Sequence, residues 1–255
     1  MRTSLGNYRA LVHSLTAAKS ADRKPAAIWT KRIIDLFLPT VCAVCSKLGP
    51  IICPDCLKKF PVIEGPCCMR CGYPLEETAA NCARCRTESF NLQQVQACFA
   101  FSEPIAGVVH RYKYEGLFAL AHPLGTLMAR LWPDWAHPVD VIVPIPLHPR
   151  RQRARGFNQA ALLAQQLSSH QAVEVNEQIL RRVRYTIPQI GLSPTRRKEN
   201  VWQAFAAEPG SLNGMRVLLI DDVYTTGATM TSAANALLNA GAKSVSAYCL
   251  ARAVQ

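Results

Sequence analysis

A short, wholly apolar run that ends in two adjacent acids constrains the fold of this chain more than any other feature. Residues 217–220 read Val-Leu-Leu-Ile, and Asp221 and Asp222 follow at once. An apolar run of this length is typical of a parallel strand that is buried on both faces. From about Thr226 to residue 240 the pattern is helical. A buried strand that turns into a helix predicts an α/β domain, in which helices cover both faces of a parallel sheet.

The turn between this strand and this helix has the composition of a phosphate site. Open α/β sheets bind ligands at the carboxyl ends of their strands, and the free N–H groups at a helix start attract anions. Adjacent carboxylates can accept hydrogen bonds from a ribose diol. The predicted ligand-binding residues are Asp221, Asp222, Thr225, Thr226, Gly227, Ala228 and Thr229. The alternative is a buried strand whose acids only cap the next helix, because Asp and Thr are common N-cap residues.

Residues 139–146 form a second apolar run, and a basic segment follows it. Four arginines occur within residues 150–155, before a helix expected to run to about Ser169. Arginine forks at the end of a strand can neutralise a pyrophosphate. The predicted pyrophosphate-binding residues are Arg150, Arg151 and Arg155. The alternative is a solvated basic loop that only keeps the helix soluble.

Two further segments could reach the same cleft. Residues 181–205 are rich in arginine and too irregular for a plain connection, so we expect a mobile lid with Arg196 and Asn200 as its candidate contacts. The alternative is a disordered basic loop. Residues 112–116, Tyr-Lys-Tyr-Glu-Gly, end an apolar helix expected at about 104–112. They could enter the cleft, or their aromatic rings could belong to the core.

The cysteines predict two metal sites upstream of this domain. Eight of the cysteines form four CxxC pairs. The two residues between the cysteines of a pair let one turn of chain direct both thiolates at one ion, and two pairs complete a tetrahedral zinc site. Sequential pairing then gives two structural zinc ions, and Cys67 is left over. Disulfides, a redox motif and an iron–sulfur cluster are the alternatives. We expect Cys98 and Cys249, in apolar runs, to be buried and inert. The predicted zinc ligands are Cys42, Cys45, Cys53, Cys56, Cys68, Cys71, Cys82 and Cys85.

Composition adds limits on partners and on location. The chain has a net charge of +12, which suits an anionic ligand or a nucleic acid. No apolar run approaches the roughly 18 residues of a membrane span, and no secretory signal is visible, so we expect a cytoplasmic protein without membrane insertion. The expected domains are a basic extension at 1–36, a double zinc ribbon at 37–90 and the α/β domain at 91–255.

The motifs resemble a known family. Residues 220–229, Ile-Asp-Asp-Val-Tyr-Thr-Thr-Gly-Ala-Thr, resemble the motif with which type I phosphoribosyltransferases bind 5-phosphoribosyl-1-pyrophosphate (PRPP). Before it come four CxxC pairs, Lys-Tyr-Glu-Gly at 113–116, and Pro-Leu-His-Pro-Arg-Arg with Arg-Gly-Phe-Asn-Gln at 146–159. Pro-Gln, Gly-Leu-Ser, Arg-Arg and Asn-Val follow within 188–201. This order resembles the ComF family of competence-associated proteins over residues 37–252.

The resemblance implies a function as well as a fold. In the transferase family the two acids hold the ribose hydroxyls and the Thr/Gly loop holds the 5′-phosphate. It implies PRPP bound with Mg²⁺ and transfer of the phosphoribosyl group with release of pyrophosphate, a glycosyltransferase reaction in which Asp221 and Asp222 are the catalytic candidates. It also implies a role in DNA uptake. The alternative is a non-catalytic accessory that senses PRPP or binds single-stranded DNA, with zinc ribbons that dock other competence proteins.

Overall fold

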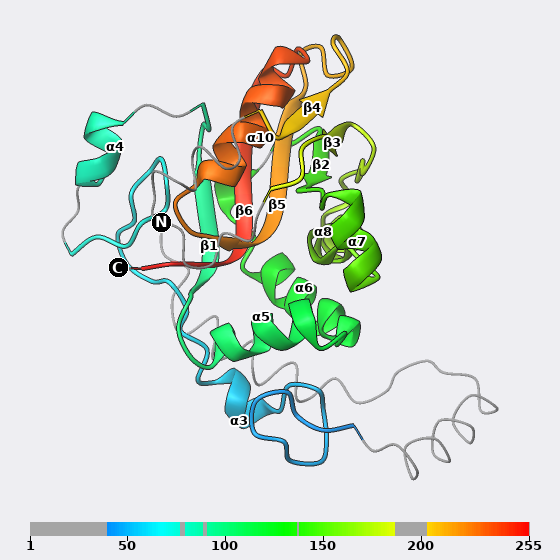
Figure 1. Cartoon of the computed structure of the whole chain (residues 1–255). Coiled ribbons are helices and arrows are strands. Elements are labelled where there is room, and N and C mark those ends of the chain that lie inside the picture. The colour runs from blue at the N-terminus through cyan, green and yellow to red at the C-terminus, as the bar shows by residue number, and fades with distance from the viewer. Residues whose placement is uncertain (1–39, 77–79, 89–90, 137, 187–202, 255) are drawn as a thin grey trace.

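The computed structural model describes residues 40–76, 80–88, 91–136, 138–186 and 203–254. Its centre is a four-stranded parallel sheet with the strand order β1–β6–β5–β2 (Figure 1). The strands are β1 (Val95–Ala100), β2 (Val141–Pro144), β5 (Arg216–Tyr224) and β6 (Ser244–Arg252). The expected extension at 1–36 lies outside the described residues.

Strand β5 is buried on both faces and alternates between two cores. Leu218 and Ile220 pack into one apolar cluster, whereas Val217 and Leu219 pack into the other. β5 is longer than expected, because its pairing with β6 continues to Tyr224. The two acids therefore lie within the second half of the strand and not after its end.

Helices cover both faces of the sheet, as predicted. The helices α5 (Ile105–Tyr114), α6 (Ala121–Arg130) and α8 (Gln159–Gln171) pack into the cluster that holds Leu218. Helix α10 (Ala228–Asn239) packs into the other cluster, together with the antiparallel pair β3 (Leu180–Arg182) and β4 (Phe205–Ala207). Two 3₁₀ turns, η1 (Phe118–Leu120) and η2 (Asp134–Ala136), complete the connections.

The arginine segment forms a helix of its own, α7 (Pro149–Arg155), and not a loop. The ring of His148 accepts a hydrogen bond from the Arg150 N–H at 3.2 Å, and Pro149 occupies the first turn, where no N–H is needed. Gly156 ends the helix with a φ of 85°. Every residue of α7 is at least partly exposed, so the arginines of this helix are accessible.

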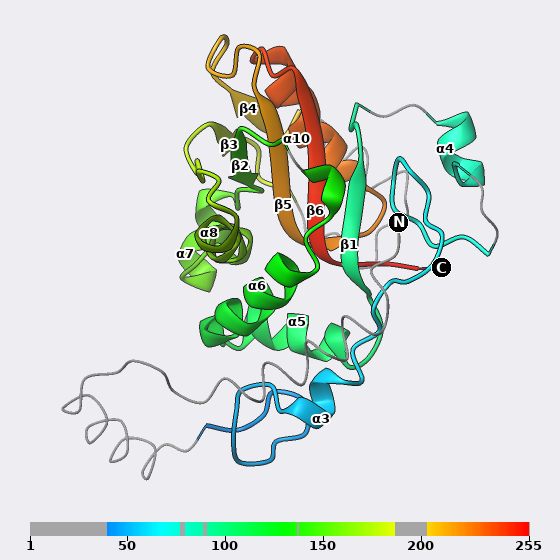
Figure 2. The same cartoon turned by 180° about the vertical axis from the view of Figure 1, so that it is seen from behind.

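The two cysteine-rich segments lie against different parts of the α/β domain. The first contains α3 (Pro54–Leu57), and its Leu57 and Phe60 belong to the same apolar cluster as α5. The second contains α4 (Ala83–Thr87) and bonds to β1, where the Val95 N–H donates to the Arg70 carbonyl at 2.8 Å. Figures 1 and 2 show α3 beside α5, and α4 well apart from it beyond the edge strand β1.

The chain between these segments protects the edge of the sheet. The Ile63 N–H donates to the Cys98 carbonyl at 3.0 Å, and the Ala100 N–H donates to the Pro61 carbonyl at 2.8 Å. Val62 and Phe99 form an antiparallel bridge. An edge strand that is paired in this way offers less backbone to other chains. Within the described part of the chain, no helix combines the length and apolar character that crossing a bilayer demands.

Candidate functional site

A cavity of about 1400 Å³ lies beside the second half of β5. Both acids of the strand reach it, as do residues of the turn into α10 and of helix α7. Among the predicted ligand-binding residues, those that line the cavity are Asp221, Asp222, Thr225, Gly227, Ala228, Thr229, Arg151 and Arg155. Thr226 and Arg150 are not among its described lining residues.

Residues 225–229, here called the phosphate loop, require glycine at one position. Gly227 caps α10 with a φ of 78°, a conformation that side-chain-bearing residues adopt only with strain. A Cβ atom at this position would lie 2.3 Å from the Tyr224 hydroxyl oxygen. The Thr226 hydroxyl accepts a hydrogen bond from the Ala228 N–H at 3.4 Å. The loop therefore brings backbone N–H groups and the start of α10 to the cavity, as an anion site needs.

The carboxylate of Asp222 is almost fully buried and is paired with a lysine. Lys113, at the end of α5, places its Nζ 2.8 Å from Asp222 Oδ1. The other oxygen, Asp222 Oδ2, is buried and has no hydrogen-bond partner among the described residues. Asp222 therefore keeps one acceptor atom for a group that enters the site.

Asp221 is the acid whose protonation responds to neutral pH. Burial and the adjacent Asp222 carboxylate raise its pKa, Lys113 opposes the rise, and the net pKa is about 7. Its Oδ1 accepts the Asp222 N–H at 2.9 Å. The site therefore holds two neighbouring carboxyl groups in different environments.

Three arginines line the same cavity as these acids. Arg151 donates to the Thr186 carbonyl at 2.8 Å, and Arg155 donates to the Gln159 side chain at 2.5 Å. Arg182, in β3, is buried and bonds the Thr186 hydroxyl at 2.5 Å. Burial and, to a smaller extent, the nearby charge of Arg151 lower the pKa of Arg182 to about 10. A concentration of positive charge at this wall of the cavity suits a pyrophosphate.

Some of these positions were not singled out by sequence. Arg182 gave no local signal beyond its place in an arginine-rich segment. Lys113 belongs to the segment that we expected to reach the cleft, and it does line the cavity. Of its neighbours, Tyr112 is buried in the core, while the exposed Tyr114 ring lies 5.2 Å from the Arg155 guanidinium. The expected lid residues Arg196 and Asn200 lie outside the described residues.

The eight CxxC cysteines gather into two groups of four, in the arrangement that sequential pairing predicts. In each group the four sulfur atoms lie within 4.8 Å of one another. Two of the sulfur separations, Cys45 to Cys53 and Cys71 to Cys82, are 3.7 Å. Four sulfurs at zinc-bonding distance in a tetrahedron are about 3.8 Å apart, so both groups fit Zn²⁺. The first group is Cys42, Cys45, Cys53 and Cys56, and the second group is Cys68, Cys71, Cys82 and Cys85.

In each group, backbone N–H groups favour the thiolate form that zinc needs at one cysteine. Burial acts to raise the pKa of Cys42, but the N–H groups of Cys45, Cys53 and Val44 lower it to about 6. The Cys53 N–H lies 3.3 Å from the Cys42 sulfur. Cys68 has the same arrangement in the second group and also a pKa of about 6. Cys67 stands outside both groups, and Cys98 and Cys249 are buried, as expected.

Comparison with known proteins agrees with both halves of this description. The family model of the phosphoribosyl transferase domain matches residues 140–255, and that of the double zinc ribbon domain matches residues 33–86. About half of the chain (51%) also aligns with a quarter (25%) of a solved glutamine PRPP amidotransferase from B. subtilis, at 22% identity and a TM-score of 0.35. The two family models, together with the cysteine groups, define a phosphoribosyltransferase-type protein with a double zinc ribbon.

Relatives identify the family. Competence protein F of Haemophilus influenzae is 32% identical over 79% of this chain and 90% of its own length. DNA utilization protein YhgH of Salmonella typhimurium is 35% identical over 72% of this chain and 83% of its own. Competence protein ComFC of Bacillus subtilis is 32% identical over 79% of this chain and 84% of its own length. The chain belongs to the ComF family.

Proposed function

We propose that this protein binds PRPP with Mg²⁺ in the cavity beside β5 and transfers the phosphoribosyl group to an acceptor. The observation that carries the proposal is the convergence of three kinds of group on one cavity: two carboxylates, a glycine-containing loop at a helix start, and a wall of arginines. The size of the cavity, about 1400 Å³, leaves room for an acceptor beside PRPP.

Each group has a role in this reaction. The phosphate loop holds the 5′-phosphate through its N–H groups and through the hydroxyls of Thr225 and Thr229. Asp221 and Asp222 accept hydrogen bonds from the ribose hydroxyls, and their negative charge stabilises the positive charge that develops on the sugar. Arg151, Arg155 and Arg182 hold the pyrophosphate. The bond from ribose C1 to pyrophosphate breaks, and a new bond from C1 to the acceptor forms.

Magnesium fits the donor set at this site. Mg²⁺ prefers carboxylate oxygens together with substrate phosphates, and Asp222, which lines the cavity, has a second oxygen, Oδ2, without a hydrogen-bond partner among the described residues. When bound, the ion neutralises charge on the departing pyrophosphate. Lys113 holds the other oxygen of Asp222 at 2.8 Å and so keeps the carboxylate in one orientation.

The biological setting follows from the relatives. One is named a competence protein and another a DNA utilization protein, so we propose that this chain also serves DNA uptake or use. Its eleven cysteines, none of which forms a disulfide among the described residues, suit the reducing cytoplasm. Docking of other competence proteins on the zinc ribbons belongs to the same proposal.

The second candidate is a non-catalytic accessory that binds single-stranded DNA or senses PRPP. The exposed Tyr185 ring favours it, because the guanidinium groups of Arg150 and Arg151 lie 5.6 and 5.8 Å from the ring centroid and His148 packs edge-on against it. Arginines beside an exposed aromatic ring are typical of surfaces on which unpaired bases stack.

Calorimetry with Mg²⁺ and PRPP tests the main proposal. We expect saturable binding to the wild type, and no binding to the Asp221→Ala/Asp222→Ala variant. Asp134→Ala, which removes an exposed carboxylate on η2, is the control and should bind as the wild type does. Equal binding by all three proteins would remove this site from the proposal.

Turnover separates the enzyme from the accessory. Pyrophosphate release across purine, pyrimidine and nucleic-acid acceptors is expected from a transferase. An accessory would bind PRPP or DNA without releasing pyrophosphate. Any DNA binding should weaken steeply with salt and survive the two aspartate substitutions.

A further inference from the structure

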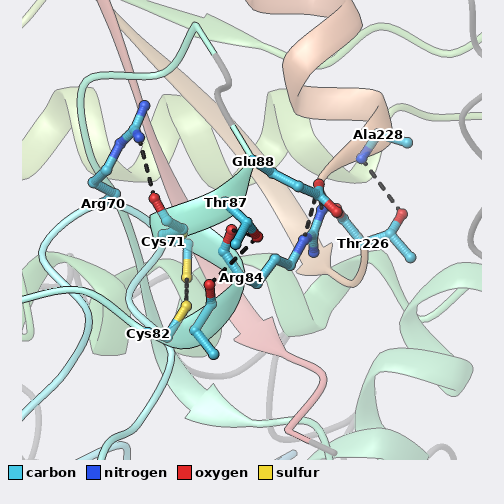
Figure 3. Close-up of polar contacts among 10 residues, drawn as sticks. Arg70, Cys71, Cys82, Arg84, Thr87, Glu88, Thr226 and Ala228 are labelled. Atoms are coloured by element: carbon cyan, nitrogen blue, oxygen red, sulfur yellow. Dashed lines mark hydrogen bonds and ion pairs between the residues drawn. The ribbon is translucent and has the colours of Figure 1, made fainter.

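The second cysteine group contacts the phosphate loop through an arginine. Arg84 lies in α4 between Cys82 and Cys85, and its Nη2 donates to the Thr226 carbonyl at 2.8 Å (Figure 3). Glu88 Oε2 accepts from the same guanidinium at 3.3 Å, one helical turn later. The Arg84 guanidinium is therefore held between Glu88 of its own segment and the Thr226 carbonyl.

A second arginine connects the same two regions from the side of the sheet. Arg252, at the end of β6, donates from Nη1 to the carbonyl of Cys71. Its guanidinium carbon lies 5.1 Å from the ring centroids of both Tyr73 and Tyr224. Tyr73 belongs to the second cysteine-rich segment, and the Tyr224 hydroxyl lies against Gly227.

The geometry of the Thr226–Gly227 peptide gives the first contact a consequence for binding. A trans peptide is planar, so the N–H of Gly227 points away from the direction of the Thr226 carbonyl. Arg84 holds the Thr226 carbonyl toward α4, so the Gly227 N–H points the opposite way. Gly227 itself lines the cavity. A hydrogen bond to the carbonyl also polarises the peptide and strengthens the N–H as a donor. Thr226, which does not line the cavity, thus acts through its backbone.

We propose that the second cysteine group, with its zinc, is a positioning element of the PRPP site, and that Arg84 is the residue through which it holds the phosphate loop. This inference rests on the proposed function. Because coupling between two ligands is reciprocal, bound PRPP should slow the loss of zinc from the second group, and loss of that zinc should weaken PRPP binding. The first group packs against α5, and its Ala43 and Val44 also line the cavity, so the Arg84 contact is tested by the first zinc, whose release should be the same in Arg84→Met as in the wild type.

The test compares Arg84→Met with Arg86→Met. Both arginines are exposed, carry the same charge and flank Cys85 in α4, but only Arg84 has a hydrogen bond to the phosphate loop. In calorimetry with Mg²⁺ and PRPP, we expect about three- to tenfold weaker binding for Arg84→Met and an unchanged affinity for Arg86→Met. Arg84→Lys keeps a charged donor and should recover part of the loss.

Two readouts do not depend on transfer activity. Hydrogen exchange of the amides in residues 225–231 of ligand-free protein should be faster in Arg84→Met than in the wild type and Arg86→Met. In the presence of a colorimetric chelator, PRPP should slow the release of one of two zinc ions from the wild type, and this protection should shrink in Arg84→Met. Zinc content before the assay identifies folded protein, and Arg84→Lys replaces Arg84→Met if the latter loses zinc.

The outcomes separate the inference from the proposed function. If the wild type binds no PRPP, the proposed function fails, and faster exchange in Arg84→Met would still support the role of Arg84 in holding the loop. If the wild type binds PRPP but Arg84→Met matches Arg86→Met in affinity, exchange and zinc release, the inference is overturned.

Discussion

At the residue scale, the two neighbouring aspartates on β5 have different surroundings. Asp222 is buried and paired with Lys113 at 2.8 Å. Asp221 is partly exposed, and burial with the adjacent charge of Asp222 raises its pKa to about 7. A carboxyl group with a raised pKa is frequent at functional sites. The sequence identifies both acids, but it does not show which of them is paired.

The pKa of Asp221 predicts a pH dependence of PRPP binding. A carboxyl group with a raised pKa holds its proton below that pKa, and a protonated Asp221 has lost its negative charge and presents an O–H donor in place of one acceptor oxygen. Affinity should therefore fall by about tenfold for each pH unit below 7 and level off above it. Calorimetry from pH 5.5 to 8.5 measures this dependence.

The control is Asp221→Asn, which cannot ionise. This variant should bind PRPP more weakly than the wild type at pH 8. It should keep only the shallower pH dependence that comes from the 5′-phosphate of PRPP, because a phosphate monoester has a second pKa of about 6. An unchanged pH profile in this variant would assign the titration to another group.

At the scale of elements, the unit formed by β5, the phosphate loop and α10 was predictable because its pattern is local. The apolar run, the hydroxyls, the glycine and the helical periodicity are all contiguous. The end of β5 was not predictable, because it depends on pairing with β6 as far as Arg252. The helix at the arginines was also missed, although His148, Pro149 and Gly156 are the capping residues that begin and end it.

Substitution of Gly227 tests this unit. Gly227→Ala should destabilise the protein by about 2–4 kcal/mol, because it adds a clash with the Tyr224 hydroxyl to the strain of a positive φ. It should also weaken PRPP binding. Gly214→Ala is the control, since Gly214 has a φ of 76° but nothing within 4 Å of an added Cβ. It should cost about 1 kcal/mol and leave binding unchanged. Urea denaturation measures the loss of stability, and calorimetry measures the loss of PRPP affinity. Equal losses in Gly227→Ala and Gly214→Ala would exclude the Tyr224 contact as a cause.

At the scale of the whole molecule, the two cysteine groups support different regions. The first group packs with α5 through Leu57 and Phe60, and the second contacts β1, β6 and the phosphate loop. Segments this short bury little apolar surface, so metal binding supplies much of their folding free energy. Each zinc is therefore expected to stabilise its own neighbourhood.

Loss of one zinc should have a local effect. Cys42→Ser should lower the zinc content from two ions per chain to about one and speed hydrogen exchange in α5 more than in α10. Cys67→Ser is the control, because Cys67 lies among the other cysteines but in neither group, and it should retain two ions. Elemental analysis and exchange detected by mass spectrometry check both variants. Two retained ions in Cys42→Ser would contradict the assignment of the first group.

The amino-acid sequence by itself determined the features that depend on residues close together in the chain. These are the class of fold, the phosphate loop, the adjacent acids and the two sets of CxxC cysteines, because propensity, periodicity and ligand spacing act over a few residues. Tertiary structure alone decided which distant groups meet. Lys113 faces Asp222, Arg182 lines the cavity, and Arg84 reaches Thr226 across 142 residues of sequence. The physical reason is that such contacts arise when helices and zinc-ribbon segments from distant parts of the chain pack against the sheet. A pattern of neighbouring residues does not predict this packing.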